Sequence, residues 1–125
     1  MGQNFLIDTN VIIDFSHGIF SEKSKDFVAS ILNEKSIISA ITQIELLGFS
    51  TVPPQIEKFV RFTSIVGIND SVIEKTIEIR KKHRIKLPDA IIAGTALVNN
   101  LTLLTRNISD FSGIENLEVV NPHEI

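Results

Sequence analysis

Short apolar runs alternate along this chain with longer segments whose apolar residues recur at helical spacing. Each run is only four or five residues long and nearly continuous, which is typical of a strand buried on both faces of a parallel sheet. We expect strands at residues 4–8, 36–39, 64–68, 101–105 and 117–120.

The segments between the runs predict helices. A short apolar stretch, residues 11–15, is interrupted only by Asp14 and predicts a first helix that stops near Gly18. The later helices are expected to begin at residues that cap a helix or set its first turn, namely Ser21, Thr42, Pro54, Asp70 and Pro88. The helix from Thr42 should extend through Phe49, and the last, residues 88–98, is apolar nearly all round and should be deeply buried.

This alternation predicts the α/β class, as a three-layer α/β/α sandwich with a mainly parallel central sheet. The 125 residues suit one domain, 1–125, and contain no repeat or linker-like tract. Open sheets of this kind build their sites beyond the carboxyl ends of the strands.

Polar residues stand at those strand ends. Asp8 ends the first strand, Glu45 lies one turn into the helix after the second, and Asp89 lies in the first turn of the buried helix. Asn107 and Asp110 follow the strand that ends at Thr105. Carboxylates brought together repel one another unless a cation lies among them, and Mg²⁺ or Mn²⁺ prefers such oxygen ligands. A metal held in this way can activate water and neutralise charge on a phosphodiester.

Each acid also has a purely structural explanation. Asp8 could cap the following helix, and Thr42 with Glu45 has the spacing of a capping box. Asp89 could complement the positive end of its helix, and Asp110 could be a turn residue. These explanations do not account for the recurrence of acids at the one sheet edge where such folds build sites.

Four motifs resemble those of PIN domains. Residues 6–14 contain Asp8-Thr9-Asn10 after an apolar strand, which resembles the family's opening, and residues 39–49, 87–96 and 104–111 resemble its second, third and fourth motifs. Their order, spacing and overall length are similar to those of VapC toxins from toxin–antitoxin pairs.

The resemblance implies an endoribonuclease that depends on Mg²⁺ or Mn²⁺, with Asp8, Glu45 and Asp89 as its core acids. At the fourth acid position many PIN domains have Asp where this chain has Asn107, so either Asn107 or Asp110 fills it. The resemblance also implies that Thr9, Asn10 and Thr105 orient the acids or the attacking water.

Charge limits how the chain could bind RNA. A net charge of −3 excludes a large basic surface, but residues 80–86 hold five of the twelve Lys and Arg residues. Cations also suit a helix C-terminus, so this run is either a helix end or an RNA contact. The candidate RNA-binding residues are Lys81, Lys82, Arg84 and Lys86. The absence of Cys excludes zinc ribbons, disulfides and thiol catalysis.

The resemblance implies an RNA substrate, with transfer RNA a candidate, a cognate antitoxin and a homodimer. The candidates for a surface that binds the antitoxin or a second copy are Phe59, Val60, Phe62 and the turn Val52-Pro53-Pro54. No apolar run reaches about 18 residues and the N-terminal residues lack the pattern of a signal peptide, so we expect a cytoplasmic protein with no membrane association.

Three other functions compete with this one. A receiver-like regulatory domain has a similar length and fold class, but it requires a late Lys that is absent near Thr105. A catalytically weak or inactive PIN scaffold that only binds partners stays open because of Asn107. A dehalogenase-type phosphatase needs Asp-x-Asp, which Asn10 breaks, and the three His residues show no metal-like spacing.

Overall fold

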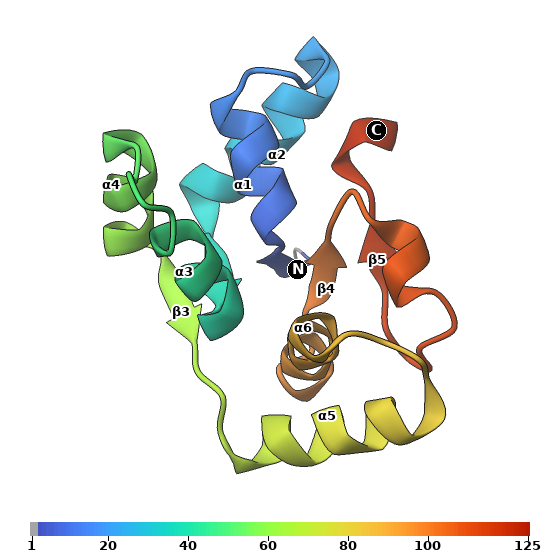
Figure 1. Ribbon diagram of the computed structural model, residues 1–125. Helices are drawn as coiled ribbons and strands as arrows, with labels where there is room; N and C mark the ends of the chain where they lie inside the picture. Colours follow the sequence, from blue (N-terminus) through green and yellow to red (C-terminus); the bar gives the residue numbers. More distant parts are fainter. Residues whose placement is uncertain (1–2) are drawn as a thin grey trace.

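The computed structural model describes residues 3–125 and has the predicted three-layer architecture (Figure 1). The strands of the central layer are β1 (Phe5–Ile7), β2 (Ile37–Ser39), β3 (Ser64–Val66), β4 (Thr102–Leu104) and β5 (Val119–Val120). The six helices are α1 (Thr9–Ser16), α2 (Glu22–Glu34), α3 (Ala40–Leu47), α4 (Pro54–Phe62), α5 (Asp70–Lys82) and α6 (Leu87–Val98). The described residues also contain two short 3-10 helices, η1 (Ile108–Phe111) and η2 (Pro122–Glu124).

Every strand pairing in residues 3–125 is parallel, as predicted. β4 pairs with β1 on one side and β5 on the other, and β2 pairs with β3. β1 and β2 are in contact, so the two groups of strands form one layer in the order β3, β2, β1, β4, β5. All carboxyl ends therefore meet at one edge of this layer.

Alternation along the strands divides the core in two. Phe5 and Ile7 face a cluster formed with α1, α2 and α4, whereas Leu6 between them faces a cluster formed with α5 and α6. This is the period of two expected for a strand covered on both faces. In Figure 1, α1 and α2 accordingly lie on one side of the strands, and α5 and α6 on the other.

Burial of α6 is confirmed, and its small residues explain how it packs. Ala90, Ala93 and Ala96 have no exposed surface. A methyl group added to Gly94 would lie 2.8 Å from Thr76 Oγ1 of α5, so the two helices approach closely at this point.

Several expected boundaries of helices and strands are wrong by a short distance. α3 begins at Ala40 rather than Thr42 because Ser39 Oγ accepts the backbone N–H of Thr42, and it ends at Leu47. Asn69, not Asp70, caps α5 by accepting the N–H of Val72. The apolar run at 64–68 is paired only as far as Val66.

Candidate active site

Asp8 lies where β1 passes into α1 and is only 6% exposed. Its Oδ1 accepts the backbone N–H of Thr9 at 2.8 Å, so the predicted capping role is present. Its Oδ2 accepts hydrogen bonds from Asn10 Nδ2 at 3.1 Å and from Thr105 Oγ1 at 2.8 Å. Two strand ends that are distant in sequence therefore meet at this one carboxylate.

Burial raises the pKa of Asp8, because a charged carboxylate loses its hydration inside the protein. The hydrogen bonds from Thr105, Thr9 and Asn10 act in the opposite direction, and the negative charge of Glu45 raises the pKa further. The three donors thus offset only part of the cost of burying this acid.

Glu45 projects from α3 toward the start of α1. Thr9 Oγ1 donates a hydrogen bond to Glu45 Oε1, and it also lies 3.1 Å from the hydroxyl of Thr42. Because Ser39 caps α3, Thr42 and Glu45 do not form the capping box that their spacing allowed. The structural explanation offered for Glu45 is therefore wrong, and its carboxylate is directed to Thr9 instead.

Asp89 occupies the first turn of α6 and is partly buried. Burial is the largest cause of its raised pKa, followed by the negative charges of Asp8, Asp110 and Glu45. Lys86 lowers the pKa, but not enough to reverse the shift. The carboxylates of three other segments therefore act electrostatically on Asp89 at the carboxyl edge of the sheet.

The segment after β4 contributes both hydroxyl and backbone groups. Thr105 is fully buried, and its Oγ1 accepts hydrogen bonds from Asn10 Nδ2 and from the backbone N–H of Asn107, each at 3.1 Å. Asn107 itself is exposed. Asp110 lies one turn further on, in η1, and is the charged residue of this segment that acts on Asp89.

Sequence reasoning missed an ion-pair cluster beside this site. Asp14 is 3% exposed, and its Oδ1 and Oδ2 accept hydrogen bonds from Arg106 Nη1 at 2.9 and 3.0 Å. His123 Nε2 lies 2.8 Å from Asp14 Oδ2. The available signal was a lone acid within the apolar stretch of α1, but its partners are 92 and 109 residues away.

The chemistry of the four carboxylates fits a divalent cation, because their mutual repulsion is what such an ion relieves. Across residues 3–125, however, no three Asp, Glu or His side chains are arranged to hold one ion together. Mg²⁺ usually binds through one or two carboxylates plus water and substrate phosphate, so the arrangement suits such an open site rather than a closed protein cage.

The basic run lies next to Asp89. Three of its cations, Arg80, Lys81 and Lys82, form the last turn of α5, as expected for cations at a helix C-terminus. The other two, Arg84 and Lys86, precede α6. Residues 80–85 line an open surface pocket of about 550 Å³. Lys81, Lys82, Arg84 and Lys86 are all exposed, so a polyanion could reach them.

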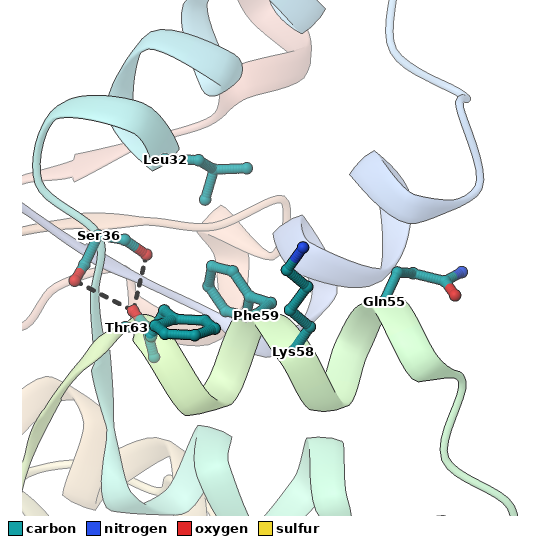
Figure 2. Close-up of a pocket in the computed structure, with 7 residues that line it drawn as sticks. Leu32, Ser36, Gln55, Lys58, Phe59 and Thr63 are labelled. Carbon is teal, nitrogen blue, oxygen red and sulfur yellow. Dashed lines mark hydrogen bonds between the residues drawn. The ribbon is translucent and has the colours of Figure 1, made fainter.

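A second hollow, of about 330 Å³, lies between α2 and α4 (Figure 2). The hydroxyls of Ser36 and Thr63 are 2.7 Å apart at its edge. These residues precede β2 and β3, so the hollow is at the amino edge of the sheet, opposite the carboxylates. Phe62 is 74% exposed here, whereas Val60 is buried and cannot belong to a binding surface as expected.

None of the helices in residues 3–125 is both long and apolar enough to cross a membrane.

Comparison with known proteins identifies the fold. Residues 5–116 match the family model of the PIN domain. Among solved structures, a chain of a toxin–antitoxin complex from Klebsiella pneumoniae is 30% identical, with 98% of this chain and 100% of that chain covered and a TM-score of 0.77. A search of curated proteins finds no match.

Two further structures are similar. A chain of FitAcB from Neisseria gonorrhoeae is 25% identical, with 97% of this chain and 99% of that chain covered and a TM-score of 0.75. A chain of DNA-bound VapBC from Salmonella typhimurium is 22% identical, with the same two shares covered and a TM-score of 0.78, which supports the fold alone. The receiver-like alternative is incompatible with these matches, and the chain belongs to the PIN domain family.

Proposed function

We propose that this protein is an endoribonuclease dependent on Mg²⁺ or Mn²⁺, and the VapC-type toxin of a toxin–antitoxin pair. One observation supports the nuclease most directly: the pKa of Asp89 is raised by burial and then by the negative charges of Asp8, Asp110 and Glu45. Such crowding of acids destabilises the metal-free fold, and groups with pKa values shifted in this way cluster at functional sites. Membership of the PIN family agrees with this activity.

In this proposal Asp8 and Asp89 are the principal metal ligands. A bound Mg²⁺ or Mn²⁺ ion would neutralise charge on the phosphodiester and lower the pKa of water. Asp8 is held in one orientation by three hydrogen bonds, whereas Asp89 lies in the first turn of the largely buried helix α6. Asp110 contributes the fourth charge, and the amide of Asn107 is a weaker, neutral ligand.

Glu45 has a different role from the two ligands. It is exposed, and Thr9 orients one of its oxygens, so an incoming water can reach the carboxylate. We assign it to orienting that water or accepting its proton. Thr9, Asn10 and Thr105 act indirectly, by holding Glu45 and Asp8 in place.

The RNA backbone would follow the exposed basic run. Lys81, Lys82 and Arg84 lie at or just after the end of α5, and Lys86 is close enough to Asp89 to lower its pKa. Phosphates bound by these cations would place a neighbouring phosphodiester at the carboxylates. Transfer RNA is a candidate substrate, because recognition of folded RNA depends on its shape.

The test is cleavage of total RNA by purified protein, with Mg²⁺, Mn²⁺ or a chelator. Asp8→Asn keeps the size of the side chain but removes its charge, and Asp26→Asn makes the same change on an exposed acid of α2. We expect metal-dependent cleavage by the wild type and by Asp26→Asn, and none by Asp8→Asn. Cleavage that survives the chelator would exclude the metal mechanism, and a wild type without cleavage would favour the binding scaffold.

The proposed partners are a cognate antitoxin and a second copy of this chain, both in the cytoplasm. The similarity to chains from toxin–antitoxin complexes supports the antitoxin. Expression of the wild type alone should stop growth, and expression of Asp8→Asn should not. Light scattering on the purified protein would reveal the homodimer, and a monomer at micromolar concentration would contradict it.

A further inference from the structure

Helix α1 binds Arg106 through two of its side chains. Asn10 and Asp14 are four residues apart in α1 and therefore lie on the same face of that helix. Asn10 Oδ1 accepts the backbone N–H of Arg106 at 3.0 Å, whereas Asp14 accepts both hydrogen bonds from the guanidinium. One helix face thus fixes the backbone and the side chain of the same residue.

Arg106 immediately follows Thr105, so the two residues are coupled through the backbone, and a shift of Arg106 can move the Thr105 hydroxyl. That hydroxyl and the amide of Asn10 are the two donors to Asp8 Oδ2. They also bond to each other, with Asn10 Nδ2 donating to Thr105 Oγ1 at 3.1 Å. The chain of contacts from Asp14 to Asp8 is therefore continuous through Arg106, Asn10 and Thr105.

The C-terminal segment completes the burial of Asp14. His123, in η2, bonds to Asp14 Oδ2, and its ring packs on Phe20 with the ring centroids 4.3 Å apart. η2 also contacts α2. The side chain of Asp14 is 5% exposed, in contrast to 48% for Arg106, so the acid is the buried and fixed partner of the pair.

We propose that Asp14 is a positioning residue. It is bonded to His123 and holds Arg106 in place, so that Asn10 and Thr105 keep their hydrogen bonds to Asp8 Oδ2. Asp14 is not among the acids whose charges act on Asp89, and its own charge is paired with Arg106. Its effect on catalysis, which rests on the proposed function, is exerted through the orientation of Asp8.

The experiment compares Arg106→Gln, Arg106→Lys and Asp14→Asn with two control variants. Arg61→Gln and Glu57→Gln remove the same charges from an exposed ion pair in α4, where the side chains are 64% and 61% exposed. The first readout is hydrogen exchange of the Arg106 backbone N–H, or that of the residue replacing it, in metal-free protein. The second is kcat and KM for RNA cleavage with saturating Mn²⁺.

We expect exchange at position 106 to become several-fold faster in Arg106→Gln and Asp14→Asn, and to stay unchanged in both controls. We expect kcat to fall about 10- to 100-fold, the effect typical of weakened support for a metal ligand, while KM stays within about twofold. Arg106→Lys should recover most of kcat, because a single nitrogen, Nη1, makes both contacts to Asp14.

Unchanged exchange in Arg106→Gln would overturn the proposal, as would a kcat loss shared equally by Arg106→Lys. A loss of activity that only follows the unfolded fraction would also overturn it, because the pair would then serve stability alone. If Asp14→Asn does not fold, Arg106→Gln decides, since that side chain is half-exposed. If the wild type does not cleave RNA, the proposed function fails, and the exchange readout still decides whether Asp14 holds this segment.

Discussion

The hydroxyl of Thr9 at the start of α1 donates a hydrogen bond to Glu45 of α3, and it lies 3.1 Å from the hydroxyl of Thr42. Thr9 also donates its backbone N–H to Asp8. One residue therefore orients two of the candidate catalytic acids, one through its backbone and the other through its side chain.

Replacement of Thr9 by Val separates these two contacts, because Val has nearly the same shape but no hydroxyl. We expect Thr9→Val to lower kcat about tenfold, as removal of a supporting hydrogen bond typically does, while Asp8 still caps α1. Thr9→Ser keeps the hydroxyl and serves as the matched control. Equal activity of the Val and Ser variants in the RNA cleavage assay would show that Glu45 needs no support from Thr9.

The raised pKa of Asp89 predicts a pH-dependent stability difference. The folded state disfavours the charged form, so ionised Asp89 destabilises the metal-free protein, and Asp89→Asn should raise its Tm at neutral pH. As the pH falls through the raised pKa toward the ordinary value of 3.8, Asp89 takes up its proton and this difference should shrink.

Thermal melts of wild type and Asp89→Asn with chelator, between about pH 4 and pH 8, measure this difference. Asp26→Asn, on an exposed part of α2, is the control and should show no comparable trend. A difference that grows as the pH falls would contradict the direction of the shift. The same Asp89→Asn variant should have no RNA cleavage activity.

Charge reversal in the basic run tests the RNA path. We expect the double variant Lys82→Glu and Arg84→Glu to bind RNA more weakly and with less dependence on salt. The slope of log K against log salt should decrease by about 0.7 for each phosphate of single-stranded RNA that the protein no longer neutralises. Lys23→Glu with Lys25→Glu, on the exposed side of α2, makes the same charge change elsewhere. Titrations that give one common slope for both double variants would eliminate the proposed path.

The close approach of α5 and α6 predicts a coupled pair of substitutions. Gly94→Ala places a methyl group 2.8 Å from Thr76 Oγ1, which is held by its own hydrogen bond to Val72 O. We expect unfolding free energy to fall by about 1–3 kcal/mol, typical of overpacking. Thr76→Ala removes the obstructing hydroxyl, so the double variant should be more stable than the sum of the single changes predicts. Strict additivity in denaturant titrations would disprove this contact.

The fold was predictable because its cause is local. A continuous apolar run such as Phe5-Leu6-Ile7 indicates a strand covered on both faces, and the nearly all-apolar sequence of α6 indicates a buried helix. The first residues of the helices were harder to predict. Ser39 and Thr42 are both good caps, and only the hydrogen bond from the N–H of Thr42 to Ser39 Oγ shows that Ser39 is the cap. The candidate acids were identifiable from their places after strands and from the family resemblance.

Contacts over long distances in sequence were not predictable. Nothing in the sequence indicates that Asp14, Arg106 and His123 meet, because Asp14 is 92 residues from Arg106 and 109 residues from His123. Val60 was misplaced for a related reason: its helix, α4, has apolar residues on more than one face, and only the packed structure shows which face is covered.

The pairing of β1 with β4 also determines when the site can form during synthesis. During synthesis Phe5 emerges early, whereas Thr102, its partner in β4, follows 97 residues later. The N–H of Asp8 must likewise await the carbonyl of Leu104. A parallel contact of this range forms late, since the intervening chain must first be closed into a loop. A nascent chain that ends before Thr105 therefore lacks the hydroxyl that donates a hydrogen bond to the buried Asp8 carboxylate. The carboxylates come together only when nearly the whole protein has left the ribosome.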